Sequence, residues 1–467
     1  MKQIDFSKPI TLVIGLGRSG IGAAKLLNSE GKQVVVIEQE AKDSFRDIAN
    51  DLIKKGIIVY LGIPLEVSSF DKWISNISKV VVSPGISWDH ETINHLKAKG
   101  IEVKGEIGIA WESLKEIPWV GITGTNGKTT VTEMLNHILK ENQIIVPMGG
   151  NTGTAGTKIA LEVKRHPQKK PKLCIMELSS YQLESTPEIS PFIGIWTTLT
   201  PDHLERHKSI DKYIQIKRRL LQNSSIRIYN YDDNFLRSKC SILEEGIWIS
   251  AEEEGTSNKF IDYWIDSKGK VIEKGKELLD SSSLEIPGKH NLQNLLLVIA
   301  SARKIGMSGK QIEKGLETFK GVPHRLEKIG WTNNIAIFND SKATNFDSAQ
   351  IGLEAVNEPS VVIAGGQAKK GNFKDWGEML CQRAIALILF GESAKEIKDL
   401  AIKHGFKKSI YIYENLNQAT KSSIKIAKET KAKSILFSPA CASFDQYKNF
   451  EERGDHFKEI VFSIIRK

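Results

Sequence analysis

Three times along the chain, a short strand of apolar and β-branched residues runs into a loop of small and polar residues and then into a helix. The strands Ile10 to Ile14, Val120 to Ile122 and Ile335 to Phe338 lead into GLGRSG, TGTNGKT and NDSKAT, respectively. A strand that ends in such a turn and continues as a helix is the opening of a βα unit. Because strands and amphipathic helical stretches alternate almost from end to end, we predict an α/β protein with mostly parallel sheets.

Each of the three transitions can open a domain of its own. The chain has 467 residues, and at about 150 residues per domain this length favours three domains. Gly321-Val322-Pro323 interrupts the pattern, as expected at a boundary. We therefore expect domains at residues 1–105, 106–322 and 323–467. The polar residues 240–285 are expected to form a peripheral hairpin of the middle domain.

The composition is that of a globular protein and argues against several classes. The longest clean apolar run, Ala384 to Phe390, has seven residues, whereas a membrane-spanning helix needs about 20. The polar start, Met1 to Pro9, does not resemble a secretory signal, so a cytoplasmic location is expected. The net charge of +9 suits anionic ligands, but there is no basic block typical of nucleic-acid binding. The four cysteines form no CxxC pair, which argues against a zinc site or a disulfide framework.

The first glycine loop has the spacing of a dinucleotide-binding turn. Gly15, Gly17 and Gly20 follow a strand, and Glu38 ends the next strand. Glycines at these positions allow a phosphate to approach the N-terminus of the following helix, and the carboxylate can accept hydrogen bonds from a ribose. A glycine turn that only packs the helix on the sheet is the alternative, and the motif does not say which nucleotide it would bind.

The second loop is a stronger signal. Residues 124–129 present backbone N–H groups to phosphate oxygens, Lys128 is placed to reach the β- and γ-phosphates, and the Thr129 hydroxyl can bind Mg²⁺. The loop departs from the strict phosphate-loop spacing, because Ile122 stands five positions before Gly127 and the glycine lies one position earlier, at Gly121. We predict a triphosphate-binding loop.

Two polar residues follow apolar strands downstream of this loop. Glu177 comes directly after Leu173 to Met176, where a carboxylate is placed to hold Mg²⁺ directly or through water. His203 follows the strand Phe192 to Thr197. A lone histidine is more often structural, but its place after a neighbouring strand of the same sheet favours a role in the site.

Lys217 lies on the apolar face of a predicted helix, together with Ile210, Tyr213, Ile214 and Leu221. A lysine on such a face must extend its charge to solvent, pair it or lose it. Extension to solvent is the usual outcome, so the position alone leaves the role of Lys217 open.

Two later stretches contain candidate ligand contacts. Asn291 and Asn294 open an apolar helix, Leu295 to Ala302. One asparagine would be an N-cap, and the second, a turn later, suggests a polar ligand. The small-residue loop that starts at Ser438 follows the last buried strand, Ser434 to Phe437, and lies at the carboxyl edge where parallel sheets bind ligands.

Taken in chain order, these motifs resemble those of the Mur ligase family of ATP-dependent amide-bond ligases, and the resemblance spans nearly the whole chain. The motifs that carry it are GLGRSG, SPGI from Ser83, GITGTNGKTT, GGNTG around Asn151, ELSSYQLE from Glu177, DHLERH, PGKHNLQN, HRLE from His324, NDSKATN and SPACASFDQYKNFEERG. The motifs ELSSYQL, NDSKATN and SPACASFDQ together are similar to the branch that adds D-glutamate. The resemblance implies an α/β fold of three domains: a Rossmann-like N-terminal domain that binds a UDP precursor, a central P-loop ATPase-like domain and a C-terminal Rossmann-like domain that binds the amino acid.

The resemblance also implies a role for individual residues. The catalytic group would be Lys128, Glu177, His203 and Lys217, with Lys217 carried as a carbamate. The ATP contacts would be Gly124, Thr125, Asn126, Gly127, Lys128, Thr129, Thr130, Asn291, Asn294, Arg325 and Asp340. The precursor contacts would be Arg18, Ser19, Glu38, Gln39, Gly85 and Asn151. The D-glutamate pocket would be Lys342, Thr344, Lys369, Ser443, Phe444 and Phe450, and the metal ligands Thr129, Glu177, His203 and Lys217.

The chemistry implied by the resemblance is the ligation of D-glutamate to UDP-MurNAc-L-Ala with ATP and two Mg²⁺ ions, through an acyl phosphate, by a protein expected to be a monomer. The chain departs from the pattern of the family member that it resembles at Glu38-Gln39-Glu40, where that member has Asp-Thr-Arg and so an arginine that this chain lacks. No residue type identifies the base that deprotonates the incoming amine.

Three other functions explain fewer motifs. A nicotinamide-dependent oxidoreductase would leave the triphosphate loop without a role. Folylpolyglutamate synthase, which shares the central motifs, would not need the additional N-terminal domain with its own glycine turn. A non-catalytic nucleotide-binding regulator would not need Glu177, His203 and Lys217 together.

Overall fold

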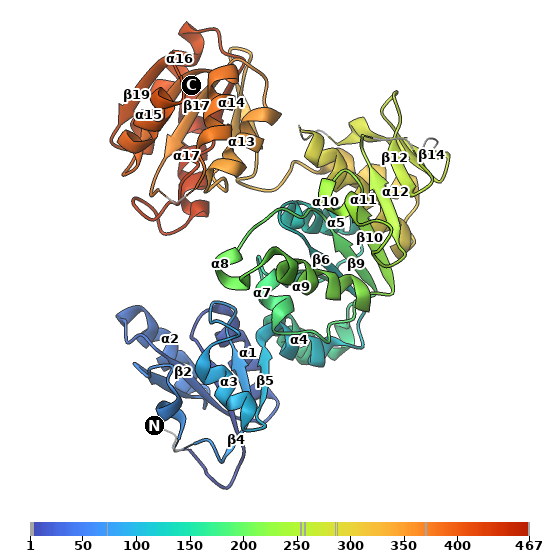
Figure 1. The fold of residues 1–467 in the computed structure, drawn as a ribbon, viewed down its shortest axis with the longest axis vertical. Helices are drawn as coiled ribbons and strands as arrows, with labels where there is room; N and C mark the ends of the chain where they lie inside the picture. Colours follow the sequence, from blue (N-terminus) through green and yellow to red (C-terminus); the bar gives the residue numbers. More distant parts are fainter. Residues whose placement is uncertain are drawn as a thin grey trace. The chain divides into compact units, whose positions relative to one another are not determined.

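The computed structural model describes residues 4–71, 73–252, 255, 258–284, 286, 288–368 and 371–465. These residues form three β-sheets, each flanked by helices (Figure 1). The chain divides into two compact units, Met1–Ser283 with Gln293–Leu316 and Leu284–Leu292 with Glu317–Lys467. The α/β class predicted from the strand–loop–helix pattern is confirmed.

The first sheet is entirely parallel and has the strand order β3-β2-β1-β4-β5. Its strands are β1 Ile10–Ile14, β2 Gln33–Glu38, β3 Ile58–Leu61, β4 Ile77–Val82 and β5 Glu102–Gly105. Its helices are α1 Arg18–Ser29, α2 Asp43–Lys54, α3 Glu91–Ala98 and α4 Glu106–Leu114, with a 3₁₀ turn at Val67–Phe70. Every residue of β1 is buried, as expected of a parallel strand covered on both faces.

The middle sheet has the strand order β14-β13-β12-β11-β10-β9-β6-β8-β7. Its strands are β6 Trp119–Thr123, β7 Met148–Gly150, β8 Cys174–Glu177, β9 Ile193–Trp196, β10 Ile226–Asn230, β11 Ile247–Ser250, β12 Ile261–Ile265, β13 Lys270–Glu273 and β14 Lys276–Asp280. Strands β6 to β12 pair in parallel, and β12, β13 and β14 form an antiparallel extension. The hairpin predicted within residues 240–285 is therefore confirmed, and it continues the sheet.

The helices of the middle region follow the strands as βα units. They are α5 Lys128–Glu141, α6 Gly156–Arg165, α7 Ser180–Glu184, α8 Leu204–His207, α9 Ile210–Asn223, α10 Asn234–Ser238, α11 Lys289–Ile305 and α12 Gly309–Thr318, with 3₁₀ turns at Pro167–Lys169 and Ser281–Ser283. Helix α7 begins with a capping box, in which Ser179 and Gln182 satisfy each other's backbone N–H groups. Ser209 caps α9 through the backbone N–H of Lys212.

The third sheet has the strand order β15-β16-β20-β17-β18-β19, and only β15 runs antiparallel to its neighbour. Its strands are β15 Glu327–Thr332, β16 Ile335–Asn339, β17 Ser360–Gly365, β18 Ala384–Phe390, β19 Ser409–Tyr413 and β20 Ser434–Phe437. Its helices are α13 Phe346–Ala355, α14 Lys374–Arg383, α15 Ala394–Lys403, α16 Leu416–Glu429 and α17 Phe450–Ile465. Apolar clusters cover both faces of this sheet.

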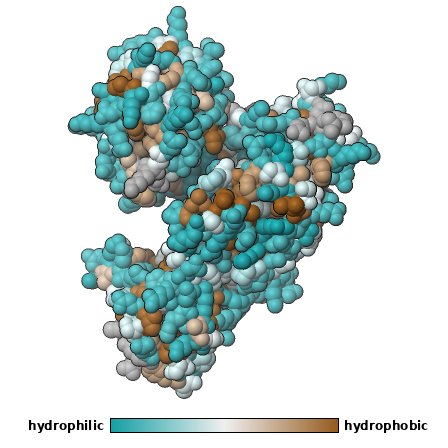
Figure 2. Space-filling model, in the orientation of Figure 1, coloured by the Kyte–Doolittle hydropathy of each residue, from teal (hydrophilic) through white to brown (hydrophobic). Residues whose placement is uncertain are grey.

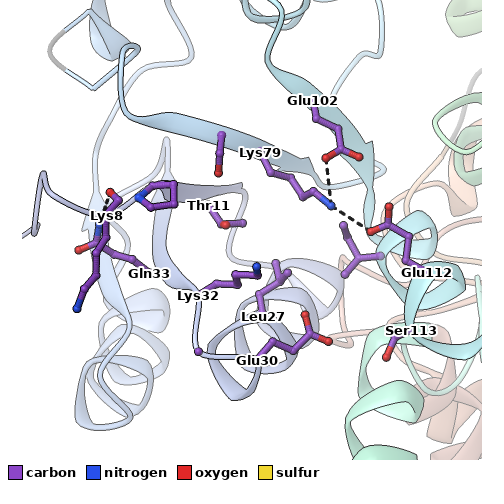
Figure 3. Close-up of a pocket in the computed structure, with 14 residues that line it drawn as sticks. Lys8, Thr11, Leu27, Glu30, Lys32, Gln33, Lys79, Glu102, Glu112 and Ser113 are labelled. Atoms are coloured by element: carbon purple, nitrogen blue, oxygen red, sulfur yellow. Dashed lines mark hydrogen bonds and ion pairs between the residues drawn. The ribbon is translucent and has the colours of Figure 1, made fainter.

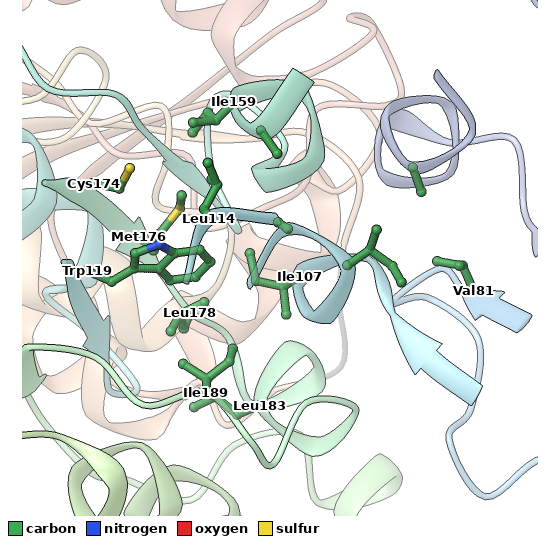
Figure 4. Close-up of a cluster of buried hydrophobic side chains, with 14 of the residues drawn as sticks. Val81, Ile107, Leu114, Trp119, Ile159, Cys174, Met176, Leu178, Leu183 and Ile189 are labelled. Carbon is green, nitrogen blue, oxygen red and sulfur yellow. The ribbon is translucent and has the colours of Figure 1, made fainter. Parts of the chain in front are cut away.

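One apolar core continues from the first sheet into the middle sheet. It runs from Val81 on β4, through Ile107 and Leu114 on α4, to Trp119 on β6 and Met176 on β8 (Figure 4). Helix α4 thus contributes side chains to both sheets. This shared core explains why the first two sheets form one compact unit although their strands do not pair.

The first sheet also has a cavity of about 540 Å³ at the amino ends of its strands. Figure 3 shows Lys79 between Glu102 and Glu112, at ion-pair distances of 3.2 and 3.1 Å. Ligands of open parallel sheets bind outside the opposite, carboxyl ends of the strands. The two ion pairs of Lys79 therefore link β4 to β5 and to α4, at the end of the sheet opposite the glycine loop.

The surface is largely hydrophilic in the view of Figure 2, and its hydrophobic side chains lie in small separate groups. Among the described helices, none combines the length and the apolar character that crossing a lipid bilayer requires.

Candidate functional site

The phosphate-type loop lies at the carboxyl edge of the middle sheet. It connects β6 to α5, and β6 is flanked by β8 and β9. Gly127 has φ +84°, a left-handed conformation that favours glycine. A Cβ there would stand 2.7 Å from Oδ1 of Asn294, so the asparagine side chain lies against the loop. Asn291 and Asn294 both lie inside α11, which begins at Lys289, so neither is an N-cap.

Glu177, the last residue of β8, is the buried carboxylate next to this loop and is only 2% exposed. Its Oε1 accepts a hydrogen bond of 2.9 Å from Nδ2 of Asn151, and its Oε2 accepts one from the Thr152 hydroxyl. Burial opposes ionisation of Glu177. The charge of Lys128 and the hydrogen bonds from Thr152, Asn151 and Thr129 outweigh burial and lower its pKa below the usual value. The lowered pKa favours the ionised form of this carboxylate beside the loop.

Two lysines converge on one carbonyl of the loop. Nζ of Lys128 donates to Gly124 O at 2.9 Å, and Nζ of Lys217 donates to the same oxygen at 2.8 Å. Lys217 is 1% exposed, and its Nζ lies 4.7 Å from the centre of the Tyr213 ring. Burial first, and the charge of Lys128 second, lower the pKa of Lys217 well below its usual value. A lysine on an apolar face usually extends its charge to solvent. Lys217 does not, because its side chain is buried.

His203 lies just before α8 in a left-handed backbone conformation, with φ +54°. Such a conformation is uncommon for a non-glycine residue and often marks a functional site. Its Nδ1 lies 3.1 Å from the Tyr181 hydroxyl, and its Nε2 lies 3.4 Å from Oδ2 of Asp202. The ring is therefore oriented by groups on two segments of the middle region.

In the first sheet, the glycine loop is held by the carboxylate predicted to face a nucleotide. Oε2 of Glu38 accepts a hydrogen bond of 2.7 Å from the backbone N–H of Leu16, whereas Gln39 is exposed. Arg18 donates from Nη1 to Gly153 O at 2.6 Å and from Nη2 to Asn151 O at 2.8 Å. The structure thus brings together Arg18 and Asn151, both of which are predicted precursor contacts.

Two further predicted contacts flank the same loop. Ser19 follows Arg18 in the first turn of α1. Gly85 lies in the loop after β4. Ser83, at the start of this loop, lies against the glycine loop, because a Cβ on Gly15 would stand only 2.6 Å from the Ser83 hydroxyl oxygen. The loops after β1, β2 and β4 therefore meet at one edge of the sheet.

Asp340 follows β16 and is 7% exposed. Its Oδ2 accepts a 2.8 Å hydrogen bond from the Ser438 hydroxyl, and its Oδ1 accepts one of 3.2 Å from the backbone N–H of Leu326. Burial raises the pKa of Asp340 to about 7, although these hydrogen bonds and the charge of Arg325 oppose the shift. Arg325 and Asp340, both predicted to contact ATP, are therefore close enough to interact.

Of the residues predicted to form the amino-acid pocket, the structure brings Lys342 and Phe450 into contact. Nζ of Lys342 lies 3.8 Å from the centre of the Phe450 ring. Ser443 is buried, Thr344 is half-buried, and Phe444 is exposed. Lys369, predicted to bind a carboxylate of the amino acid, lies outside the described residues.

Sequence reasoning missed the role of Arg453, a fully buried residue of α17. Its guanidinium donates to the backbone carbonyls of Ser341, Cys441 and Ala442 and to the Ser341 hydroxyl. It thus joins the segment before Lys342 to the segment before Ser443. The helical pattern of α17 does not require an arginine at this position. The one sequence feature that could have indicated its role is its place within the SPACASFDQYKNFEERG motif.

Tyr213 and Thr152 were also not predicted as site residues. The Tyr213 hydroxyl lies 3.1 Å from Oγ1 of Thr125, and its ring faces Lys217. The helical pattern places Tyr213 on the apolar face together with Lys217, but it does not predict that the two side chains touch. Thr152 is found only because the loop after β7 folds onto Glu177.

The donor chemistry of the middle region fits Mg²⁺ that is bound chiefly by phosphate and water. Mg²⁺ prefers oxygen ligands and commonly uses one or two carboxylates together with substrate phosphates. Glu177 and the Thr129 hydroxyl supply such oxygens side by side. In the part of the chain that the structure describes, no cluster of three or more histidine, cysteine, aspartate or glutamate side chains is arranged to hold a metal by itself.

Family models match three consecutive parts of the chain. Residues 10–105 match the Mur ligase MurD-like N-terminal domain, residues 122–302 the Mur ligase middle domain, and residues 324–441 the Mur ligase glutamate ligase domain. A protein of Prochlorococcus marinus called UDP-N-acetylmuramoylalanine–D-glutamate ligase is 54% identical over 461 residues, which are 99% of this chain and 98% of that protein. The chain belongs to the Mur ligase family.

Other Mur ligase relatives agree in sequence and in fold. A Parasynechococcus marenigrum protein, also called UDP-N-acetylmuramoylalanine–D-glutamate ligase, is 46% identical over 97% of this chain and 98% of its own length. The crystal structure of the UDP-N-acetylmuramate–alanine ligase of Thermotoga maritima has a TM-score of 0.60 at 22% identity and covers 97% of this chain and 99% of its own. A pseudomurein peptide ligase of Methanothermus fervidus has a TM-score of 0.54 at 20% identity, with coverages of 98% and 100%. The three-domain Mur ligase fold expected from the motifs is confirmed.

Proposed function

We propose that this Mur ligase joins D-glutamate to UDP-MurNAc-L-Ala, with ATP converted to ADP and phosphate, in the synthesis of peptidoglycan precursors. The observation that carries the proposal is the full-length similarity, at about half of all positions, to ligases named for D-glutamate addition. The glutamate ligase domain model over residues 324–441 agrees with it. We further expect a cytoplasmic monomer that acts on these small-molecule substrates, binds no nucleic acid and does not insert into membranes.

The reaction begins at the precursor carboxylate, which attacks the γ-phosphate of ATP and forms an acyl phosphate. Backbone N–H groups of residues 124–129 would bind the phosphates, and Lys128 would neutralise charge on the transferred group. In the structure Lys128 donates to Gly124 O and Thr125 O. Its ammonium is thus held over the loop that is expected to receive the triphosphate.

The second step is attack of the amino group of D-glutamate on the acyl phosphate, with phosphate as the leaving group. The Lys342 ammonium over the Phe450 ring and the buried Ser443 support a pocket for an anionic amino acid. We propose that Lys342, Thr344, Lys369 and Ser443 bind the two carboxylates and that Phe444 and Phe450 contact the aliphatic part. A diamino acid is disfavoured because its additional ammonium would meet lysines.

Bound magnesium would supply electrostatic stabilisation of the crowded phosphate oxygens. We propose that Thr129 and Glu177 hold one ion and that His203 and a carbamylated Lys217 take part in holding a second. The lowered pKa of Lys217 supports this modification, because only a neutral amine reacts with carbon dioxide. An uncharged or anionic group at this position also removes the repulsion with Lys128.

The proposal is tested by ADP release in reactions that pair each precursor with each amino acid. UDP-MurNAc-L-Ala, UDP-MurNAc and a folate are each combined with D-glutamate, L-glutamate, meso-diaminopimelate or L-lysine. We expect ADP release only when UDP-MurNAc-L-Ala and D-glutamate are both present. A preference for L-glutamate or a diamino acid at matched concentrations would contradict the proposed pocket, and turnover with a folate would contradict the proposed precursor.

A further inference from the structure

Arg18 connects the glycine loop of the first sheet to a loop of the middle sheet. It is the first residue of α1, directly after Gly17. Its two terminal nitrogens donate to two different carbonyls, Gly153 O at 2.6 Å and Asn151 O at 2.8 Å. A guanidinium presents several N–H donors in one rigid plane, so it can hold two carbonyls of one turn at a fixed separation.

The other side of this turn rests on Glu177. Asn151 donates from its backbone N–H to Glu177 O at 2.8 Å and from Nδ2 to the carboxylate at 2.9 Å. Thr152 donates its hydroxyl to the second carboxylate oxygen. The segment 151–153 therefore lies between the guanidinium of Arg18 and the carboxylate of Glu177, and both hold it through hydrogen bonds.

The helix that carries Arg18 is itself fixed to the segment after this turn. A Cβ on Gly22 of α1 would stand 2.5 Å from Oγ1 of Thr157 on α6, so the two helices pack closely. Thr157 in turn donates from its backbone N–H and its hydroxyl to Glu106 on α4, at 2.7 and 2.6 Å. Arg18 is thus carried by a helix that packs closely on α6, and it is exposed at the surface.

We propose that Arg18 is a positioning residue. Its two hydrogen bonds hold residues 151–153 in the shape that keeps Asn151 and Thr152 on the Glu177 carboxylate, and they thereby link the precursor loop to the ATP site. This goes beyond a simple phosphate contact, because loss of Arg18 then affects a carboxylate that it does not touch. The expected effect of Arg18 on the Mg²⁺ dependence of ADP release rests on the proposed function. Its expected effect on the stability of residues 151–153 does not depend on any reaction.

The structural test uses hydrogen–deuterium exchange of the full-length protein without ligands, followed in peptides that cover residues 148–157. The variants are Arg18→Leu, which removes both hydrogen bonds, and Arg18→Lys, which keeps the charge but has no planar pair of donors. Lys25→Leu is the matched control, because Lys25 lies on the same helix and pairs instead with Asp51 at 3.3 Å. We expect exchange in residues 148–157 to be about tenfold faster in Arg18→Leu, intermediate in Arg18→Lys and unchanged in Lys25→Leu.

The kinetic test measures the Mg²⁺ concentration that gives half-maximal ADP release at saturating precursor. We expect this concentration to rise several-fold in Arg18→Leu, and we expect the rise to be much smaller when Asn151→Ala is already present, because both changes act through the same turn. Unchanged exchange together with a higher KM for the precursor alone would overturn the proposal and leave Arg18 as a precursor contact only. If the wild-type protein released no ADP with UDP-MurNAc-L-Ala and D-glutamate, the proposed function would fail, while the exchange result would still decide the role of Arg18.

Discussion

The first sheet and the middle sheet each end their leading strand in a glycine loop that opens a helix, yet the two loops have different surroundings. In the first, Gly15 with φ +99° precedes α1, and in the second, Gly127 with φ +84° precedes α5. The first loop is held by the half-buried Glu38, through one hydrogen bond to the backbone of Leu16. The second is surrounded by the buried Glu177 and by two lysines that share Gly124 O.

This difference agrees with the proposed division between precursor binding at the first loop and phosphoryl transfer at the second. A loop with few buried charges can accept a diphosphate through backbone N–H groups and release it again. A loop with a buried carboxylate and two buried or half-buried ammonium groups can stabilise charge that moves during phosphoryl transfer, because water does not screen those groups. Under the proposed function, the same local fold would serve two tasks, and the titratable residues that neighbouring strands contribute would decide which.

The largest effect is expected from Lys128→Ala in the second loop. Ligation should fall by at least about 10³-fold, because the ammonium proposed to face the transferred phosphate is lost. Precursor binding, measured by calorimetry, should survive, since the first loop is untouched. Lys140→Ala, at the exposed end of the same helix, serves as the control. An equal loss of precursor affinity in Lys128→Ala would contradict the division of tasks.

The next largest effect is expected from Lys217→Ala. Activity should fall by about 10²-fold or more, because the side chain proposed to hold a metal as a carbamate is removed. Acetate or formate should restore part of the activity by supplying a small carboxylate. The control is Lys212→Ala on the same helix, where the lysine pairs with Asp89 at 2.9 Å near the surface. Full activity of the Lys217 variant would exclude the carbamate hypothesis.

A smaller effect, on the first loop only, is expected from Gly20→Ala. A Cβ there would stand 1.9 Å from Gly15 O, so the loop must move, and we expect a loss of about 1–3 kcal/mol in the free energy of unfolding. Gly17→Ala is the matched control for stability, because no atom lies within 4 Å of its Cβ position. Denaturant unfolding measures both variants. Equal stability of the two would mean that close contact between Gly15 and Gly20 does not shape this loop.

The smallest effect is expected from Glu38→Gln. The carboxylate accepts from Leu16 N at 2.7 Å and from Glu40 N at 3.2 Å, and an amide has only one oxygen to accept with. We expect the KM for the precursor to rise severalfold, equivalent to about 1 kcal/mol, with the KM for ATP unchanged. Glu40→Gln is the control, since Glu40 pairs with Lys42 at the surface. A rise in the KM for ATP would show that the effect of Glu38 extends beyond the first loop to the ATP site.

The strand–loop–helix units, the two glycine loops and the position of Glu177 at the end of its strand could be predicted from the sequence. Local patterns determine them: buried parallel strands are continuous apolar runs, and left-handed turns favour glycine. The motifs further identified the family. The assignments of individual residues to ATP, precursor and amino acid stay predictions, and so do the domain boundaries near residues 105 and 322.

The contacts between segments far apart in the chain were decided only by the tertiary structure. The sequence placed Lys217 on an apolar face but left open whether its charge reaches solvent, and the packing of α9 against β6 buries it beside Lys128. Nothing local predicts that Arg18 reaches Asn151 and Gly153, or that Arg453 joins residues 341 and 441–442. Hydrogen bonds of this kind depend on side-chain geometry between segments that are distant in the chain, and hydrophobic periodicity carries no information about that geometry. The backbone of each βα unit, in contrast, is determined within about 30 residues of sequence.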